Sequence, residues 1–434
     1  MSMAPPSVVT IVLAGGAGSR LRALTSDRAK PAVPFGGGYH LVDFALSNAA
    51  NSGLRDVWVI QQFHPVSLGA HLRSGRPWDL DRLDGGLLVL HPSQGTGRDG
   101  FHSGTTDALW KQVEPLREAG PEVTVVVSAD AVYRLDYEAL VRDHLASFAE
   151  VTMVTTRVDP GDAGRYGVVE VDDDGVVTSY SYKPRDPASD LICAEIFVFN
   201  TAALISALET AHDEAFASGD GDPGDIGDNV LPEMVAAGHA REWRLEGYWR
   251  DVGTIASYWA GHMDLLGEPP VHELDVPGWP LRTVSSYSGP ARTGSQAVVT
   301  SSLLGHGAVV RGTVEHSVVG PGAVVEDGAT VRDSVILPGA VGARVPGWRR
   351  RWSIRTWRSP PTHGSVSTSP GLTRRPCVWR CWGAPQAGLV HGAMWCPPGR
   401  RTRPTTTITT TTRVLGPDSC PHTGLIVQVV VNAR

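Results

Sequence analysis

The sequence predicts an α/β fold, with helices on both faces of a mixed sheet, followed by a short left-handed parallel β-helix. The sheet is predicted by β-branched runs that alternate with longer helical or irregular stretches, as in α/β domains. The clearest of these runs are Val57–Ile60, Val123–Val127 and Val151–Val154. The β-helix is predicted by small or branched apolar residues that recur every six positions. These residues are Val319, Val325, Val331 and Leu337.

The first predicted strand, Val8–Ala14, runs directly into a loop with three glycines, at positions 15, 16 and 18. Glycine lets successive backbone N–H groups turn toward a polyphosphate without interference from a Cβ atom. Arg20 and Lys30 follow, and they place positive charge where phosphates would lie. The loop lacks the Gly-Lys-Ser/Thr ending of a P-loop and the third glycine of a dinucleotide motif. A glycine turn after a strand is also common for structural reasons alone, so both interpretations stand at this point.

Two aspartates follow strand-like runs elsewhere in the chain. Asp130 ends the run that begins at Val123, and Asp251 lies in Trp249-Arg250-Asp251-Val252-Gly253-Thr254. Ligands of open α/β sheets bind beyond the carboxyl ends of the strands, so both aspartates should face the crevice of the glycine loop. Mg²⁺ takes one or two protein carboxylates and completes its shell with water and phosphate oxygens. The pair is therefore a candidate Mg²⁺ site, although an aspartate at a strand end is also a common turn former.

Several motifs resemble one enzyme family. Ala14-Gly15-Gly16-Ala17-Gly18-Ser19-Arg20-Leu21, with Lys30-Pro31-Ala32 after it, resembles the signature of sugar-1-phosphate nucleotidylyltransferases. Phe35-Gly36-Gly37 and the segment Val42–Asn48 narrow the resemblance to bacterial ADP-glucose pyrophosphorylases, the glucose-1-phosphate adenylyltransferase family. The resemblance covers about residues 1–340. It implies transfer of AMP from ATP to glucose 1-phosphate, giving ADP-glucose and pyrophosphate for glycogen or α-glucan synthesis.

The resemblance also assigns roles to individual residues. The implied catalytic residues are Arg20, Lys30, Asp130, Lys183 and Asp251, of which Asp130 and Asp251 would hold Mg²⁺. The implied nucleotide-binding residues are Leu13, Ala14, Gly15, Gly16, Gln62, Gly104 and Thr105. The implied sugar-phosphate-binding residues are His102, Gly167, Tyr182, Lys183, Cys193 and Glu195.

The chain departs from the family pattern mainly on the sugar side. Tyr182 stands where the family has a glutamate before Lys183, and His102 stands where it has a tyrosine. Cys193-Ala194-Glu195 replaces Ser-Met-Gly, which removes a hydroxyl and adds a carboxylate to the expected pocket wall. Segment 91–95 replaces a Pro-Ala-Gln-Gln-Arg loop. Two alternatives therefore remain: a nucleotidylyltransferase for another sugar 1-phosphate, and a non-catalytic regulatory subunit.

Charge and cysteine content limit the possible partners and surroundings. From Arg344 onward the chain holds 14 Arg, no Lys and one acidic residue, which leaves 24 basic and 44 acidic residues before it. An acidic body argues against nucleic-acid or membrane partners, because both require clustered cations. Cys193 is the only cysteine of that body, so no disulfide framework forms there. With neither a signal-peptide pattern nor a long apolar run, we expect a cytoplasmic protein.

The domain prediction has four parts. Residues 1–268 form the catalytic domain, 269–296 a Pro-rich linker, and 297–345 a truncated hexapeptide-repeat β-helix of fewer than three coils. Residues 346–434 show no helical, strand or hexad period, and their Arg, Trp and Pro content suggests out-of-frame translation. The family resemblance implies homotetramers, and we expect the truncated β-helix to weaken that assembly.

Overall fold

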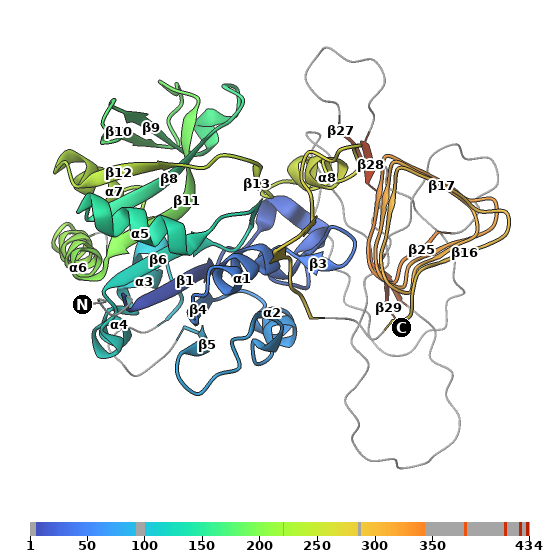
Figure 1. Ribbon diagram of the computed structural model, residues 1–434, viewed down its shortest axis with the longest axis horizontal. Coiled ribbons are helices and arrows are strands. Elements are labelled where there is room, and N and C mark those ends of the chain that lie inside the picture. The colour runs from blue at the N-terminus through green and yellow to red at the C-terminus, as the bar shows by residue number, and fades with distance from the viewer. Residues whose placement is uncertain are drawn as a thin grey trace, which may run out of the picture. The chain divides into compact units, whose positions relative to one another are not determined.

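The computed structural model describes residues 6–92, 100–219, 221–284 and 288–342, together with four short strands nearer the C-terminus. The chain divides into two compact units. The first consists of Met1–Phe35, Tyr39–Leu265 and Pro270–Ser285, and the second of Gly36–Gly38, Leu266–Pro269 and Ser286–Arg434. Figure 1 shows an α/β unit and a unit built of stacked short strands. The predicted tail, 346–434, lies outside the described residues except for the four strands.

The first unit is built on a nine-stranded mixed sheet. Its main path runs β10-β9-β11-β6-β1-β4-β5, and β8 joins β11 to β12. The pairs β1–β4, β1–β6, β4–β5 and β8–β12 are parallel, whereas β11 is antiparallel to β6, β8 and β9. The strands are β1 (Val8–Ala14), β4 (Asp56–Gln61), β5 (Gly86–Leu90), β6 (Val123–Ser128), β8 (Val151–Arg157), β9 (Gly167–Val171), β10 (Val177–Tyr182), β11 (Leu191–Asn200) and β12 (Ala240–Arg244).

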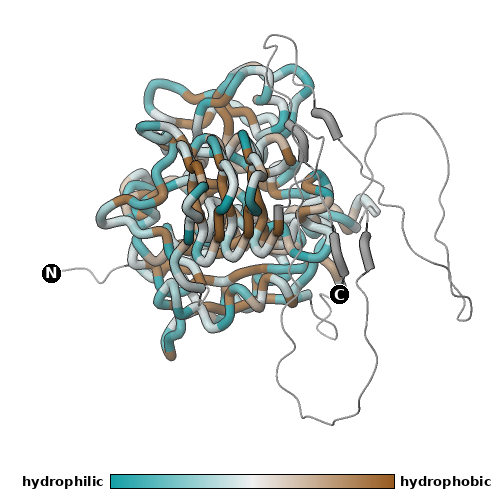
Figure 2. Tube along the Cα trace, turned by 90° about the vertical axis from the view of Figure 1, so that its right-hand side faces the viewer, coloured by the Kyte–Doolittle hydropathy of each residue, from teal (hydrophilic) through white to brown (hydrophobic). Residues whose placement is uncertain are grey.

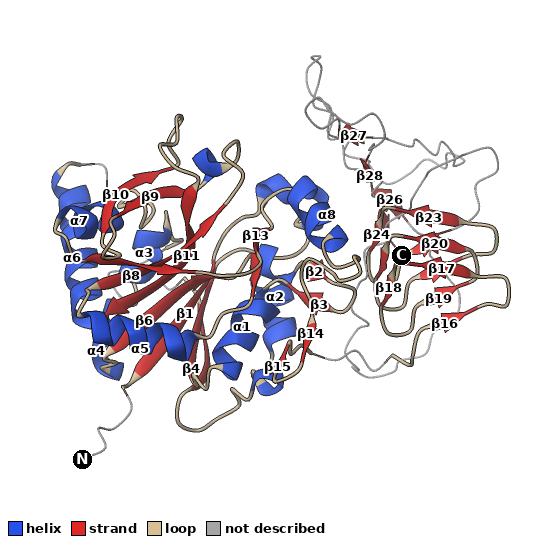
Figure 3. Ribbon diagram, turned by 45° about the horizontal axis from the view of Figure 1, so that its top comes forward, coloured by secondary structure: helices blue, strands red, loops and turns tan. Residues whose placement is uncertain are grey.

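Helices cover both faces of this sheet, as predicted (Figure 3). One face packs against α1 (Val42–Asn51), α2 (Pro65–Leu72) and α5 (Tyr137–Ser147). The other packs against α3 (Thr105–Trp110), α4 (Val113–Ala119), α6 (Thr201–Ala217) and α7 (Val230–Ala236). In β6, Val125 and Val127 join the first core and Val126 the second. Because both faces are buried, the central strands are almost continuously apolar rather than alternating.

The remaining elements of the first unit are short. Two antiparallel pairs stand apart from the main sheet, β2 with β3 and β7 with β13. Their bounds are β2 (Pro34–Phe35), β3 (Tyr39–His40), β7 (Ala131–Tyr133) and β13 (Trp249–Asp251), and α8 (Ile255–Met263) follows β13. Single 3₁₀ turns span Lys30–Ala32, Arg76–Trp78 and Ala163–Arg165, and a longer 3₁₀ segment, Ser19–Leu24, is kinked at Arg22.

The predicted linker, 269–296, does not stand apart from the two units. Its strands β14 (Asp275–Val276) and β15 (Trp279–Pro280) form a hairpin assigned to the first unit. The Trp279 indole donates to Asn48 Oδ1 at 3.1 Å, and the Arg282 backbone N–H donates to Ser47 Oγ at 2.9 Å. These bonds fasten the Pro-rich segment to α1. The linker was predicted from its proline content alone. Amino-acid composition does not reveal side-chain contacts of this kind.

The second unit is the predicted parallel β-helix. Three sheets run along it, β16-β19-β22-β25, β17-β20-β23 and β18-β21-β24. Their strands are β16 (Arg292–Thr293), β17 (Val298–Thr300), β18 (Leu303–Leu304), β19 (Val309–Val310), β20 (Thr313–Glu315), β21 (Val318–Val319), β22 (Val324–Val325), β23 (Thr330–Arg332), β24 (Val335–Ile336) and β25 (Val341–Gly342). Val319, Val325 and Val331 are buried in its core, and Figure 2 shows hydrophobic segments that repeat from coil to coil.

The β-helix is longer than predicted. Parallel pairing aligns Arg292 with Val309, Val309 with Val324, and Val324 with Val341, so three complete coils precede β25. The first coil begins inside the predicted linker. The sequence analysis missed this coil because its residues carry too few apolar side chains to show the hexad period. The four strands nearer the C-terminus form two antiparallel pairs, β26 (Cys377–Trp379) with β29 (Val431–Ala433), and β27 (Thr412–Val414) with β28 (Leu425–Val427). Among the described residues, no helix is long and apolar enough to span a membrane.

Candidate active site

The candidate site begins at the carboxyl edge of β1, β4 and β6. The parallel register pairs Ala14 of β1 with Gln61 of β4, and Leu13 of β1 with Ser128 of β6. Each strand therefore ends at the same level. The glycine loop, Gln62 and Asp130 follow these three ends and emerge next to one another, as expected for ligand sites of α/β sheets.

The glycine loop is packed against the segment that carries Lys30. Gly18 has a φ of 63°, and a Cβ there would lie 3.0 Å from both Lys30 Cβ and Thr25 Cγ2. The Thr25 hydroxyl fixes the turn by donating to the Gly18 carbonyl at 2.9 Å. At Gly16, by contrast, an added Cβ would meet no described atom within 4 Å. The loop is thus closed toward Lys30 and open at Gly16, which suits a backbone cradle for phosphate.

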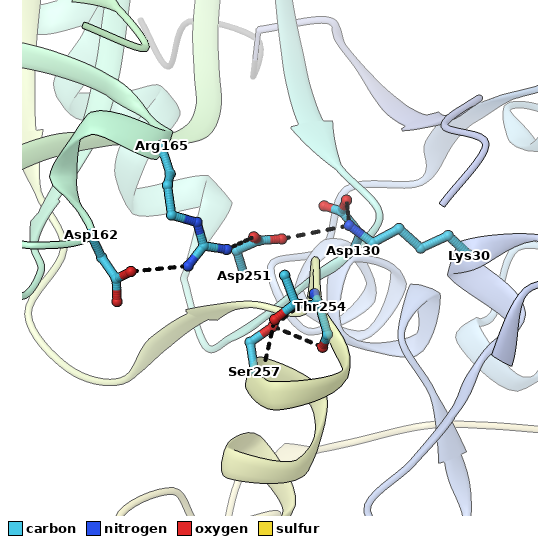
Figure 4. Close-up of polar contacts among 7 residues, drawn as sticks. All are labelled: Lys30, Asp130, Asp162, Arg165, Asp251, Thr254 and Ser257. Atoms are coloured by element: carbon cyan, nitrogen blue, oxygen red, sulfur yellow. Dashed lines mark hydrogen bonds and ion pairs between the residues drawn. The ribbon is translucent and has the colours of Figure 1, made fainter. Parts of the chain in front are cut away.

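Lys30 joins the two predicted metal carboxylates (Figure 4). Its ammonium group donates a short hydrogen bond to Asp130 and lies 3.5 Å from Asp251 Oδ1. The side chain of Lys30 is only 7% exposed. Asp130 also accepts a short bond from the Ser128 hydroxyl. A buried cation and two carboxylates, separated by 100 and 121 positions in the chain, therefore form one charged cluster.

Asp251 reaches this cluster by a different route from the one predicted. Its strand, β13, is not part of the main sheet but pairs antiparallel with β7, where Asp251 lies opposite Ala131. The Val252 N–H also donates to the Asp130 carbonyl at 3.2 Å. The two aspartates meet because β7 follows Asp130 directly, and not because their strands end at a common sheet edge.

The segment after Asp251 is held by the first turn of α8. Thr254 and Ser257 form a capping box: each side-chain oxygen accepts from the other residue's N–H, at 3.1 and 3.0 Å (Figure 4). Between them and the strand, Gly253 allows a close approach. A Cβ there would lie 2.6 Å from Asp251 Oδ2 and 3.2 Å from an Arg20 guanidinium nitrogen. Arg20, which is exposed, therefore lies beside Asp251.

Arg165 is a further cation that the sequence analysis missed. Its guanidinium lies 3.6 Å from Asp251 Oδ2 and 3.1 Å from Asp162 Oδ1 (Figure 4). One of its nitrogens is buried and finds no hydrogen-bond partner among the described residues. In the sequence, only its position two residues before Gly167 could have indicated that Arg165 belongs to the site. Asp251 thus faces three cations, Arg20, Lys30 and Arg165.

Burial and mutual repulsion separate the acidities of the two aspartates. Burial opposes ionisation of Asp130, yet Lys30 and the Ser128 hydroxyl hold the pKa of Asp130 below its ordinary value. Burial and then the charge of Asp130 raise the pKa of Asp251. Burial also disfavours the charged form of Lys30, but Asp130 and Asp251 outweigh it and raise the pKa of that lysine. Lys30 therefore remains charged between two carboxylates of unequal acidity.

Glu195 adds a third carboxylate to the same crevice. It stands where the pairing of β11 with β8 shifts register, and its φ of 57° lies in the left-handed region, which is uncommon for glutamate. Removal from water, followed by the charges of Asp130 and Asp251, raises the pKa of Glu195 to about 7. The side chain nevertheless keeps an exposed surface. Lys183 and Lys30 act to lower the pKa of Glu195, so both lysines attract its carboxylate.

Lys183 is connected to Tyr182 and, through it, to a carboxylate that the sequence analysis missed. The Lys183 ammonium lies 4.1 Å from the centre of the Tyr182 ring and donates a short bond to its hydroxyl. That hydroxyl donates to Asp225 Oδ2 at 2.9 Å. Asp225 Oδ1 accepts from the Thr105 N–H at 3.1 Å. One continuous network therefore joins a predicted nucleotide residue, Thr105, to the predicted sugar-phosphate lysine.

Gln62 and His102 form a second contact between predicted residues. The Gln62 amide donates to the His102 carbonyl at 3.1 Å and accepts a short bond from the His102 N–H. Both ring nitrogens of His102 are buried without a hydrogen-bond partner among the described residues. Burial, with Lys111 as the next cause, lowers the pKa of His102. A neutral imidazole therefore lies beside the residue predicted to bind the base.

Three other predicted residues have clear packing roles. A Cβ at Gly167 would lie 2.5 Å from the Tyr180 hydroxyl, and one at Gly104 would lie 2.1 Å from the Gly224 carbonyl, so neither position has room for a side chain. Cys193 is 2% exposed and belongs to the core on one face of the sheet, which leaves its sulfur no open surface. Glu195, two residues later, is the residue of that segment that reaches the crevice.

Comparisons with known proteins agree with this architecture. The family described as nucleotidyl transferase matches residues 9–268, and the family described as GlmU-like, C-terminal hexapeptide, matches residues 289–345. Proteins named glucose-1-phosphate adenylyltransferase from Bacillus mycoides (strain KBAB4) and Bacillus anthracis are each 37% identical to this chain over 333 residues. The protein of that name from Bacillus cytotoxicus is 36% identical over the same length. Each alignment covers 76% of this chain and 87% of the relative.

Proposed function

The chain belongs to the glucose-1-phosphate adenylyltransferase family, and from that premise we propose that it transfers AMP from ATP to glucose 1-phosphate. The products are ADP-glucose, for glycogen or α-glucan synthesis, and pyrophosphate. The observation that carries the proposal is the cluster of Lys30, Asp130 and Asp251 beside a glycine loop that is open at Gly16. We propose the cytoplasm as its location, where both substrates are available.

Asp130 and Asp251 fit a bound Mg²⁺. Both carboxylates contact the same ammonium group, and Asp130 opposes ionisation of Asp251, so a divalent cation between them would relieve this repulsion. Two carboxylates are also the usual protein contribution to a Mg²⁺ shell that includes substrate phosphates. Bound there, Mg²⁺ would neutralise charge on the phosphates of ATP.

The residues of this chain would then act mainly by positioning. A phosphate oxygen of the sugar phosphate attacks the α-phosphorus of ATP in line, a new P–O bond forms, and the bond to pyrophosphate breaks. The attacking phosphate oxygen is already ionised, so the reaction needs no general base. Arg20 and Lys30 would bind the triphosphate and the charge that develops on the leaving pyrophosphate, while the loop of Gly15 and Gly16 donates backbone N–H groups.

Lys183 would bind the phosphate of the sugar. Its side chain is exposed but held over the ring of Tyr182, so less rotational freedom is lost when the sugar phosphate binds. Thr105 and Gln62 would contact the nucleotide. Both residues are held in place by hydrogen bonds to neighbouring segments. The network through Asp225 would couple the two substrate halves of the site.

One observation favours a second candidate, a nucleotidylyltransferase for a different sugar 1-phosphate. Glu195 brings a carboxylate into the crevice beside Lys183, where the family pattern has glycine. A carboxylate that accepts hydrogen bonds from sugar hydroxyls penalises any sugar that leaves it unpaired, by about 1–3 kcal/mol. Sugar preference could therefore differ from that of the relatives while nucleotide chemistry stays the same.

The test is pyrophosphate release by the purified full-length protein. ATP and the other nucleoside triphosphates are combined with glucose 1-phosphate and other hexose 1-phosphates in the presence of Mg²⁺. The first proposal expects the highest kcat/KM for ATP with glucose 1-phosphate, and the second expects ATP with another sugar. Absence of turnover with every pair, in protein that is folded and binds ATP, would instead favour a regulatory subunit.

A further inference from the structure

A second cluster of metal-ligating side chains lies outside the site described above. It consists of His40 in β3, Asp43 in the first turn of α1, and His71 in the last turn of α2. One ligand atom from each residue lies within 4.8 Å of the others. None of the three has a role in the proposed reaction.

Asp43 and His71 are buried, His40 is half-buried, and the three side chains are already oriented toward one another. Asp43 is fully buried, and His71 is 6% exposed. His71 Nε2 lies 2.5 Å from Asp43 Oδ1, and His40 Nδ1 lies 4.0 Å from Asp43 Oδ2. The rings of His40 and His71 are tilted against each other, with centroids 3.9 Å apart. Two imidazoles and one carboxylate thus converge on one point.

The unsatisfied atom of the cluster is His40 Nδ1. It is buried and finds no hydrogen-bond partner among the described residues, although a carboxylate oxygen lies 4.0 Å away. A buried ring nitrogen without a partner costs free energy, and a bound ligand would remove that cost. The backbone N–H of His40 donates to Asp43 Oδ2 at 2.8 Å, which holds the carboxylate in place as metal sites require.

We propose that His40, Asp43 and His71 bind a first-row transition metal ion of the Zn²⁺ type. Two nitrogen ligands and one oxygen ligand, with a water molecule as the fourth, are a common tetrahedral set for Zn²⁺. Mg²⁺ is disfavoured, because it prefers an octahedron of oxygen ligands. Metal coordination requires neutral imidazoles.

The ion would stabilise the segment that leads to Lys30. It would join β3 and α1 to α2, and α2 also carries Ser67, whose hydroxyl accepts from the Ala29 N–H at 2.9 Å. Ala29 directly precedes Lys30. A metal that fixes α2 would therefore fix the backbone beside the catalytic lysine without touching either substrate.

The test is a Co²⁺ titration of the full-length protein after chelator treatment, followed by visible absorption spectroscopy in excess Mg²⁺. Excess Mg²⁺ occupies oxygen sites such as Asp130 and Asp251. His40→Gln removes one ligand at a position that is 28% exposed, so the fold should survive, and His239→Gln is the matched surface control. Histidines and cysteines other than His40 and His239 are common to all three proteins, so any binding there cancels in the difference.

We expect wild type and His239→Gln to bind one equivalent of Co²⁺ that His40→Gln binds at least tenfold more weakly, with loss of the corresponding absorption bands. Zn²⁺ should also raise the Tm of wild type and His239→Gln more than that of His40→Gln, because a ligand bound only to the folded state stabilises it. Equal Co²⁺ affinity and equal Tm shifts in wild type and His40→Gln would overturn the proposal. The apo Tm of each variant is measured first, so that loss of folding is recognised separately.

Discussion

Replacing Asp130 or Asp251 with asparagine should have the same effect on turnover and different effects on stability. Each substitution removes one of the two proposed metal ligands, and we expect kcat to fall by about 10²-fold or more, equivalent to about 2.7 kcal/mol of transition-state stabilisation. Stability should differ because the pKa of Asp130 is lowered in the folded protein and that of Asp251 is raised.

The structure sets the size of the two stability effects. Asp130 forms the closest ion pair of Lys30, whose side chain is 7% exposed, and breaking a buried pair typically costs about 3–5 kcal/mol. Asp251 remains 3.5 Å from the ammonium, so we expect Asp130→Asn to cost about 2 kcal/mol. Asp251→Asn removes a repulsion together with weaker attractions, and we expect a change within about 1 kcal/mol.

The sign of the pH dependence follows from linkage. A carboxyl with a lowered folded-state pKa stabilises the protein above its unfolded pKa and loses that contribution as the pH falls. A carboxyl with a raised folded-state pKa does the reverse. The stability difference between Asp130→Asn and Asp251→Asn should therefore be full at pH 8 and narrow as the pH falls toward about 4, where carboxyls of the unfolded chain protonate.

Two assays check this reasoning on full-length protein. Thermal unfolding at several pH values, without nucleotide or divalent ions, gives stability, and pyrophosphate release with saturating substrates and Mg²⁺ gives kcat. Asp213→Asn, at a side chain that is 84% exposed, is the control. Near-normal kcat in either variant would refute the metal assignment. Equal destabilisation by Asp130→Asn and Asp251→Asn at pH 8 would refute the electrostatic account of the cluster.

Three further predictions concern the sugar side of the site. Asp225→Ala should raise KM for the sugar 1-phosphate by about 5–100-fold, the equivalent of about 1–3 kcal/mol, because Tyr182 loses the acceptor that orients it; Asp213→Ala should leave KM unchanged. Glu195→Gly combined with Tyr182→Glu should move the ranking of hexose 1-phosphates toward glucose 1-phosphate, measured as kcat/KM with ATP; an unchanged ranking would exclude a role of these residues in sugar choice. Glu195→Gln should raise Tm relative to wild type above pH 7 and not at pH 5, because ionisation of a carboxyl whose pKa is raised to about 7 disfavours the folded state as the pH rises; a Tm difference independent of pH would contradict this.

The parts of the structure that the sequence predicted are those governed by local pattern. Val8–Ala14 is apolar except at Thr10 because both faces of β1 are buried, and that run indicated a central strand followed by a functional loop. The hexads after Val319 indicated stacked coils for a similar reason, since each coil buries the same positions against the next. Asp130 and Asp251 were predicted to be partners because each follows a strand-like run, and ligands of open α/β sheets bind beyond the carboxyl ends of the strands.

Contacts between distant segments could not be predicted in the same way. The pairing of β7 with β13, which brings Asp251 to Asp130, involves strands of three residues without a detectable period. Arg165 and Asp225 reach the site from turns whose composition resembles that of any surface loop. A residue in such a turn has a function only through the segment that lies across from it, and a single sequence does not contain that information.

Tyr182 stands where the family pattern has glutamate. The site nevertheless keeps a negative charge that acts on Lys183, but a different residue, Asp225, carries it. Tyr182 cannot neutralise Lys183, but its hydroxyl accepts from the lysine and donates to Asp225, so a carboxylate still acts on the lysine through one intervening group. The ring also lies under the ammonium, at 4.1 Å, and adds a cation–π attraction. Because Asp225 binds Thr105 as well, the charge that orients Lys183 depends on the segment proposed to contact the nucleotide. The proposed sugar and nucleotide halves of this site are therefore linked through Tyr182, a residue that departs from the family pattern.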